Sequence, residues 1–352
     1  MQCCWRRQRS KLGPGRKNKK THYIIRRILM SPFVCFSKID PVVFVAAMLD
    51  CLARFLVRKF RRHYKFETDN VKTDNLNVKT QSGSEFKYPF ERRHYDGPFD
   101  GEKLYEFFGN LVIKCYNNSD GHPVAIKFLT ADYLHASEAD MMAYAHSQNL
   151  LVPDVWTCCK FGSDRIAMIT DFVQGSPLDE VWPTLNEEQR ASIKGQLAEQ
   201  LKLFRSCTQS YIGRIHRQPT RNPYEGVETK FMGPFDSEAA FDEWCLSRIK
   251  NAFTRCKWRK KLARLRRKSP SKFVLTHGDL FPRNILVENG KITGIVDWEH
   301  SGFYPDYVEY ALAACLYDYS GEEWWKPVLM EVLTACAPER LNFQSLIYDR
   351  GY

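Results

Sequence analysis

The sequence predicts an α+β fold in which a small antiparallel sheet precedes a mainly helical part. Short β-rich runs at 111–114, 124–129, 155–160 and 166–170 surround one segment of helix-forming composition at 135–148. Helical patterns dominate from Gly175 onward. A second, smaller strand pair is indicated at 285–296, around the dipeptide Asn289-Gly290, which is a strong hairpin signal.

Composition and charge separate an N-terminal arm from the rest of the chain. With 352 residues and 44% hydrophobic content the chain can bury a sizeable core, which excludes a wholly disordered, collagen-like or coiled-coil protein. Residues 1–65 hold 17 Lys and Arg and two acids, whereas the other 287 residues hold 35 bases and 39 acids. The net charge of +11 therefore belongs to the arm, and no specific nucleic-acid partner is expected.

Residues 1–95 are predicted to be a basic extension followed by a polar linker. Asp50 and Arg54 interrupt the apolar stretch at 41–57 and would each cost about 2.5–3.5 kcal/mol at the centre of a bilayer. Because they stand four residues apart, an amphipathic helix over 41–62 is favoured over a membrane span. The arm could make peripheral membrane contact, carry a palmitoylation site at Cys3-Cys4, act as an organelle presequence, or be dispensable.

The twelve cysteines are scattered and form no CxxC pair, which is typical of reduced thiols. The polar, basic start of the chain does not resemble a secretory signal. We therefore expect a cytoplasmic location.

Two helical segments are predicted between residues 186 and 268. The first begins at Asn186 and keeps one apolar face through Arg205. The second begins after residues 233–237, and its tail runs into 255–268, where nine of fourteen residues are Lys or Arg. This basic run is interpreted either as a nucleic-acid patch or as an exposed, solvated insertion.

Residues 273–299 carry the most informative pattern. A strand at 273–276 leads into a polar loop that contains His277 and Asp279. If the following hairpin turns tightly at Asn289-Gly290, Asn284 opposes Ile295. Asn284 and Asp297 then meet at the open end of the hairpin, where the loop with Asp279 enters.

Two carboxylates and a carboxamide at one place suit Mg²⁺, which prefers oxygen ligands. Phosphoryl transfer uses such a metal site together with a separate acid that accepts the proton of the attacking hydroxyl. An alternative is that the three side chains only cap a loop and a hairpin.

These motifs resemble those of a known family. The segments His277-Gly-Asp279-x₄-Asn284 and Ile295-Val-Asp297-Trp-Glu299 are similar to the aminoglycoside phosphotransferase and choline kinase family, especially to its fungal members, and the resemblance covers about 104–350. It implies a bilobal protein-kinase-like fold, with an N-lobe at 96–173, a C-lobe at 174–352 and ATP between the lobes. It further implies that Asp279 is the catalytic base, that His277 orders the catalytic loop, and that Asn284 and Asp297 bind Mg²⁺.

A kinase-like N-lobe needs a strand lysine that holds phosphates and pairs with a helix glutamate. Lys127 and Glu138, eleven residues apart, fit this pattern, and Lys114 is the alternative lysine. The run 169–175 looks like the hinge, in which backbone groups of Asp171 and Val173 would bind adenine.

The chain departs from protein kinases at several positions. It has no GxGxxG, since 105–116 contain only Gly109, and Gly278 and Phe281 replace the Arg and Lys of the protein-kinase loop. A small-molecule hydroxyl acceptor is therefore favoured. Acids and aromatic residues C-terminal to Asp297 could bind a cationic acceptor or belong to helix surfaces and the core: Tyr304, Asp306, Tyr307, Glu309, Asp318, Glu322, Glu323, Trp324 and Trp325.

The predicted function is ATP- and Mg²⁺-dependent transfer of the γ-phosphate of ATP to a hydroxyl of a small molecule. The alternatives are a catalytically silent, nucleotide-binding kinase-like protein and a protein-kinase-like enzyme.

Overall fold

The computed structural model describes residues 93–107, 110–130, 133–162, 165–224, 231–316 and 324–348. The chain divides into two units, Met1–Lys65 and Phe66–Tyr352, and all described residues belong to the second. The basic arm and the amphipathic helix predicted at 41–62 lie outside the described residues. Within the described ranges, no helix is both long and apolar enough to cross a bilayer.

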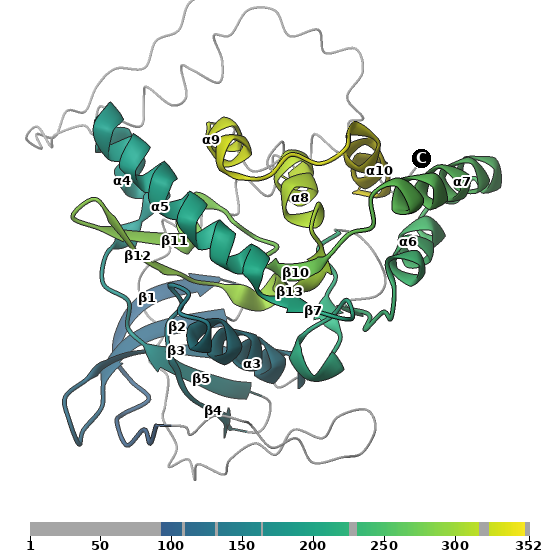
Figure 1. Cartoon of the computed structure of the whole chain (residues 1–352). Coiled ribbons are helices and arrows are strands. Elements are labelled where there is room, and N and C mark those ends of the chain that lie inside the picture. The colour runs from purple at the N-terminus through teal and green to yellow at the C-terminus, as the bar shows by residue number, and fades with distance from the viewer. Residues whose placement is uncertain are drawn as a thin grey trace, which may run out of the picture. The chain divides into compact units, whose positions relative to one another are not determined.

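A five-stranded antiparallel sheet forms the N-terminal lobe (Figure 1). Its strands lie in the order β1 (Glu102–Phe107), β2 (Asn110–Tyr116), β3 (Pro123–Thr130), β5 (Arg165–Asp171) and β4 (Val155–Phe161), and helix α3 (Tyr133–Ser147) follows β3. The two-residue period of β3 buries Val124, Ile126 and Phe128 on one face. Lys127 therefore faces the opposite side, toward the catalytic segment of the chain.

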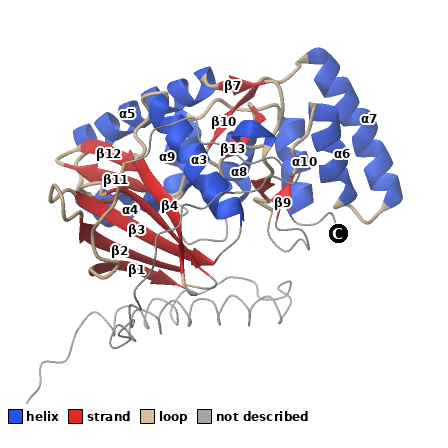
Figure 2. Cartoon of the chain, turned by 90° about the horizontal axis from the view of Figure 1, so that it is seen from below, coloured by secondary structure: helices blue, strands red, loops and turns tan. Residues whose placement is uncertain are grey.

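Helices dominate the C-terminal lobe, as Figure 2 shows from a second direction. This arrangement confirms the predicted α+β, bilobal fold class. The remaining elements are β6 (Ser176–Pro177), α4 (Leu178–Val181), η1 (Trp182–Thr184), α5 (Glu187–Ser206), β7 (Thr208–Gln209), η2 (Ile215–Arg217), β8 (Thr220–Arg221), β9 (Phe231–Met232), α6 (Glu238–Ser247), α7 (Ala252–Lys268), β10 (Phe273–Thr276), η3 (Pro282–Asn284), β11 (Ile285–Glu288), β12 (Lys291–Ile295), η4 (Trp298–His300), β13 (Gly302–Pro305), α8 (Val308–Leu316), α9 (Trp325–Val332) and α10 (Pro338–Tyr348).

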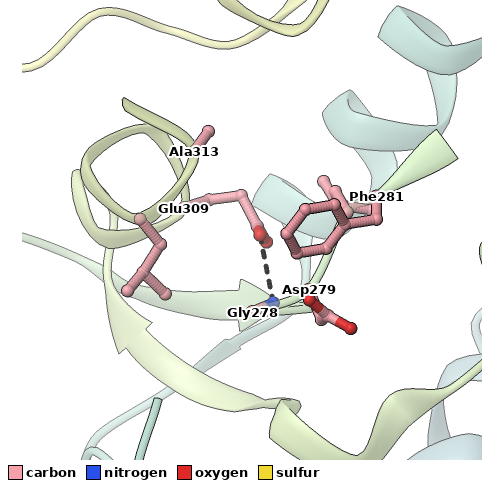
Figure 3. A pocket seen from close by; sticks show the side chains of 7 residues that line it. Gly278, Asp279, Phe281, Glu309 and Ala313 are labelled. Atoms are coloured by element: carbon pink, nitrogen blue, oxygen red, sulfur yellow. Dashed lines mark hydrogen bonds between the residues drawn. The ribbon is translucent and has the colours of Figure 1, made fainter. Parts of the chain in front are cut away.

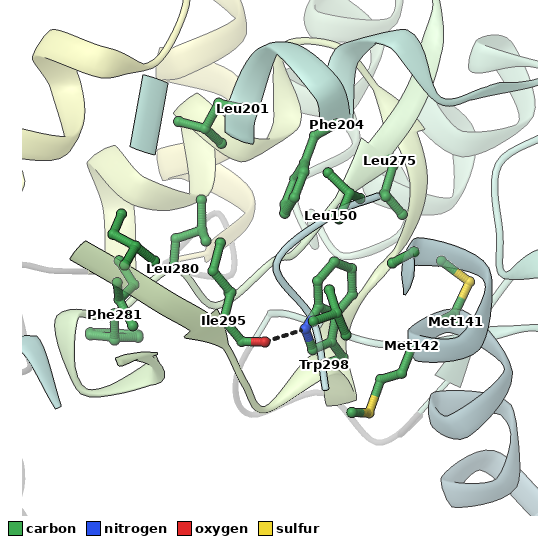
Figure 4. Close-up of a cluster of buried hydrophobic side chains, with 14 of the residues drawn as sticks. Met141, Met142, Leu150, Leu201, Phe204, Leu275, Leu280, Phe281, Ile295 and Trp298 are labelled. Atoms are coloured by element: carbon green, nitrogen blue, oxygen red, sulfur yellow. Dashed lines mark hydrogen bonds between the residues drawn. The ribbon is translucent and has the colours of Figure 1, made fainter. Parts of the chain in front are cut away.

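Helix α5 begins where the sequence predicts. Asn186 and Gln189 form a reciprocal capping box, in which each side chain accepts a backbone N–H of the other residue. The predicted apolar face of α5 is buried in a core that extends into both lobes. Figure 4 shows Leu201 and Phe204 of α5 in this core, with Trp298 and with Met142 of α3.

The second predicted helix is in fact two. Ser237 caps α6 and Asn251 caps α7, each by accepting a backbone N–H three residues later. Because Asn251 starts a new helix, the basic run at 255–268 belongs to an independent helix and is not a tail of α6.

The register of the catalytic hairpin differs from the prediction by one residue. Ile295 pairs with Ile285, not with Asn284, because Thr293 of β12 is an extra residue between the pairs formed by Ile292 and Gly294. The Thr293 hydroxyl donates to the carbonyl of Gln174, 2.5 Å away. Both Asn284 and the residues after Ile295 still lie at the open end of the hairpin.

The connection between the lobes is packed closely against this hairpin. Strand β6 pairs with β11, and Gly175 just before it has φ +119°. A Cβ at Gly175 would lie 2.8 Å from the carbonyl oxygen of Val287. Glycine is therefore required here both for its backbone conformation and for the close approach of two chain segments.

We predict that Gly175→Ala lowers the free energy of unfolding by about 2–4 kcal/mol. Two costs add up: alanine is strained at this positive φ, and its Cβ would clash with the backbone of Val287. Gly121→Ala is the matched control, since Gly121 has φ +68° and a Cβ there meets nothing within 4 Å. It should cost only about 1–2 kcal/mol. Urea denaturation of both variants measures the difference, and equal losses would contradict the packing described for Gly175.

Candidate active site

Lys127 connects three elements at the centre of the site. Its Nζ lies 3.0 Å from Oε1 of Glu138 on α3 and 2.8 Å from Oδ1 of Asp297, just after β12. The Glu138 side chain is only 1% exposed. Burial opposes the charge of Lys127, but attraction to Asp297 and Glu138 outweighs it and raises the pKa of Lys127, so the ammonium stays charged.

The alternative lysine lies elsewhere. Nζ of Lys114 lies 4.1 Å from the ring centroid of Phe172, a cation–π contact at the end of the sheet. The structure thus brings Lys127, and not Lys114, to Glu138.

Asp279 lies in the loop between β10 and η3, beside Asn284. The Asn284 Nδ2 group donates to the Asp279 carbonyl oxygen at 2.9 Å and to its Oδ2 at 3.0 Å. Burial raises the pKa of Asp279, and the nearby His300 and Arg283 oppose this shift. The carboxylate, 14% exposed and held by Asn284, is available as a proton acceptor.

His277 is fully buried and connects the Asp279 loop to the segment that leads into Asp297. Its Nδ1 accepts the Asp279 N–H at 3.3 Å, so its Nε2–H donates to the carbonyl of Val296, 3.1 Å away. Burial lowers the pKa of His277 to about 4. The imidazole is therefore neutral at physiological pH and orders the loop, in line with the role that the sequence predicts for it.

Glu309 of α8 supports the same loop through hydrogen bonds to its backbone, and Figure 3 shows its carboxylate pointing toward Gly278. Its carboxylate accepts the backbone N–H groups of His277 at 2.6 Å and Gly278 at 3.0 Å. Burial raises the pKa of Glu309 to about 7, although these two bonds oppose the shift. Gly278 itself has φ +82°, and a Cβ there would lie 2.8 Å from the carbonyl oxygen of His300.

The sequence allows Glu309 and several aromatic residues either to bind the acceptor or to belong to the core. Because their side chains are buried, these residues belong to the core and do not bind the acceptor. Tyr304 and Tyr307 are buried, and Trp325 donates its Nε1–H to the carbonyl of Leu280 at 2.9 Å. Trp324 is 37% exposed. The acids at 318, 322 and 323 lie outside the described residues.

Asp297 and Asn284 are the oxygen donors that could hold a metal ion. Asp297 has a left-handed backbone, φ +64° and ψ +62°, which Asp tolerates better than most residues. Its side chain is 38% exposed, and one of its oxygens contacts Lys127. Among the described residues no group of three His, Cys, Asp or Glu side chains is arranged for a metal. A metal here would therefore need the Asn284 amide oxygen, phosphate and water, which suits Mg²⁺.

Two arginines that the sequence pattern did not indicate hold the segment after Asp297 in place. Arg221 pairs with the Glu299 carboxylate. Burial would raise the pKa of Glu299, but His300, Lys127 and Arg221 lower it to about 2. The buried Arg214 donates to Ser137 of α3 and to the carbonyls of Glu299 and Ser301. Arg214 lies in irregular structure, so no periodic pattern could indicate it.

Of the two predicted hinge residues, Asp171 is the last residue of β5 and Val173 lies just beyond the strand. The Asp171 N–H donates to the carbonyl of Asp154 at 2.9 Å, and its carboxylate accepts from Trp156 at 2.7 Å. Only its carbonyl oxygen could therefore contact adenine, and that oxygen already accepts the Thr170 hydroxyl at 3.1 Å. The Val173 side chain packs against Gly294 of β12.

We predict that Glu309→Gln changes how stability depends on pH. The pKa of Glu309 is raised in the folded state, so the Glu309 carboxyl group binds its proton more tightly in the folded chain than in the unfolded chain. The stability gained from this tighter proton binding is complete below the pKa of an unfolded glutamate, about 4.3, and is lost as the pH rises through 7. Urea titrations at pH 5 and pH 8 should show wild type losing stability relative to Glu309→Gln at the higher pH. A difference that is independent of pH would contradict the assignment.

Comparisons with known proteins show the family of the chain. Residues 130–340 match the phosphotransferase enzyme family. The aminoglycoside 3'-phosphotransferase of Streptomyces fradiae is 26% identical over 208 residues, which cover 56% of this chain and 69% of that protein.

Solved structures also resemble the chain. One is a thermostable mutant of the aminoglycoside phosphotransferase APH(4)-Ia with AMP-PNP and hygromycin B, at 16% identity, a TM-score of 0.45, and coverage of 71% of this chain and 83% of that one. Another is a putative fructosamine-3-kinase from Haemophilus somnus, at 16% identity, a TM-score of 0.49, and coverage of 73% and 82%. Since the family match extends over more than half of the sequence, from the end of β3 into α10, the chain belongs to the phosphotransferase enzyme family.

Proposed function

We propose that the enzyme transfers the γ-phosphoryl group of ATP to a hydroxyl group of a small molecule, with the help of Mg²⁺. The observation that carries this proposal is the placement of Lys127 between Glu138 and Asp297, with Asp279 on the adjoining loop. A partly buried, paired lysine and two separately held carboxylates are the parts that phosphoryl transfer requires.

Nucleotide binding would use both lobes. The Lys127 ammonium, held by Glu138, would contact the α- and β-phosphates, and the carbonyl oxygen of Asp171 and backbone groups at Val173 would contact adenine. Asn284 and Asp297 would hold Mg²⁺, which would neutralise charge that develops on the phosphate oxygens.

The chemical step would depend on Asp279. The acceptor hydroxyl would give its proton to the Asp279 carboxylate while its oxygen attacks the γ-phosphorus and the bond to ADP breaks. The neutral His277 and the Glu309 carboxylate would keep the Asp279 backbone in place without taking part in proton transfer.

The acceptor that we propose is a hydroxylated, cationic small molecule. The Streptomyces fradiae relative is named for its action on aminoglycosides, which are cationic at neutral pH. An excess of acids over bases beyond residue 65 favours a cationic ligand as well. A cytoplasmic location is a further proposal, and it rests on the scattered cysteines of the sequence.

We predict that Asp279→Asn lowers acceptor-dependent ATP consumption by about 10²–10⁴-fold, the usual contribution of a general base. The measurement is an acceptor-library screen on wild type, followed by kinetics with the best acceptor. Thermal protection by Mg²⁺ and ATP should persist in the variant, because Asp279 does not contact Lys127. Asp236→Asn, an exposed carboxylate on another part of the C-lobe, is the matched control and should keep full activity.

Equal activity of wild type and Asp279→Asn would show that Asp279 is not the base. Thermal protection by Mg²⁺ and ATP without turnover of any acceptor would instead favour a catalytically silent, nucleotide-binding protein.

A further inference from the structure

Helix α7 is a strongly basic element on the surface of the C-lobe. Its sequence, Ala252–Lys268, contains nine Lys and Arg and no acidic residue. Figures 1 and 2 show α7 beside α6 at the edge of the lobe, away from the β3–α3 side that holds Lys127. An exposed helix that is only solvated usually mixes both charge signs, so a helix with one sign needs a separate explanation.

Part of the basic charge holds α7 in place. Arg259 makes two 2.7 Å hydrogen bonds with the Glu243 carboxylate of α6, and Arg266 pairs with Asp242 of α6. Leu262 is fully buried. At 100° per residue these three side chains lie on one half of the helix, which therefore faces the protein.

The opposite half carries a stripe of exposed residues, spaced four, three, four and three apart. It consists of Phe253, Lys257, Lys260, Arg264 and Arg267, and we name it the cationic stripe. With a rise of 1.5 Å per residue it is about 21 Å long. Among the described residues, no carboxylate forms an ion pair with its four bases, unlike Arg259 and Arg266.

Phe253 begins the stripe and is 79% exposed, more than any other large apolar side chain among the described residues. An aromatic ring at the end of a row of cations suits the headgroup region of a membrane, where aromatic side chains insert and Lys and Arg meet anionic lipids. A duplex nucleic acid would attract the cations but would offer this ring no apolar environment.

We propose that the cationic stripe of α7 docks the enzyme on a membrane surface rich in anionic phospholipid. The straight row of four cations, which no described carboxylate pairs, complements a flat, negatively charged surface, and each cation contributes about fivefold to the binding constant. Because α7 provides no residue of the proposed active site, docking leaves the catalytic groups unchanged.

The test is co-sedimentation of the full chain with vesicles of phosphatidylcholine containing about 30% phosphatidylserine. The variant Lys257→Gln/Lys260→Gln/Arg264→Gln removes three charges of the stripe. The matched control, Lys160→Gln/Lys202→Gln/Lys291→Gln, removes three exposed charges elsewhere. The basic residues 1–65 are present in every protein, so a difference between the variants comes from the substituted side chains.

The stripe variant should bind these vesicles at least about 10-fold more weakly than wild type, and the control should lose less than about threefold. Equal losses in the two triple variants would overturn the proposal. All substituted side chains are exposed, and thermal unfolding of each protein checks that it is folded.

A second variant separates the membrane from a nucleic acid. Phe253→Ser should weaken vesicle binding by about threefold or more and leave binding to duplex DNA unchanged. If Phe253→Ser had no effect on vesicles while the triple stripe variant lost only DNA binding, the stripe would be a nucleic-acid surface and the membrane proposal would be wrong.

Discussion

The two ion pairs of Lys127 are the interaction on which the rest of the site depends. An ammonium that is largely removed from water needs its charge compensated, and here Glu138 of α3 and Asp297 of the C-lobe both compensate it. The face of β3 on which Lys127 lies, the close packing at Gly175 and the extra residue in β12 together set the positions of these three groups. The two lobes are thus joined by charge as well as by a shared core.

Three carboxyl groups in and around the Asp279 loop have different environments, and each environment suits a different role. Asp297 contacts an ammonium and remains accessible, which suits a metal ligand. Asp279 lies in a less polar place with a raised pKa, which suits a base. Glu309 is buried on α8 and accepts the backbone N–H groups of His277 and Gly278, which suits a residue that holds the loop in place.

The sequence predicted the elements that depend on local patterns. The capping signal at Asn186 and the turn at Asn289-Gly290 are local, and the structure has both. The one-residue error in the hairpin arose because the bulge at Thr293 follows from a contact with Gln174, far away in the chain. For the same reason the support role of Glu309 and the contacts of Arg214 were missed, since only tertiary packing shows which acids and arginines are buried. The structure also explains Gly278, where a side chain would collide with His300.

The most direct test of this account is a double-mutant cycle between Lys127 and Glu138, with the affinity for ATP in the presence of Mg²⁺ measured by calorimetry. Lys127→Met should weaken binding by about 10-fold or more, and Glu138→Gln should weaken it less. The double variant should bind no worse than Lys127→Met, because Glu138 acts on ATP only by holding Lys127. Additive losses, or unchanged affinity in Lys127→Met, would contradict the central place of this ion pair.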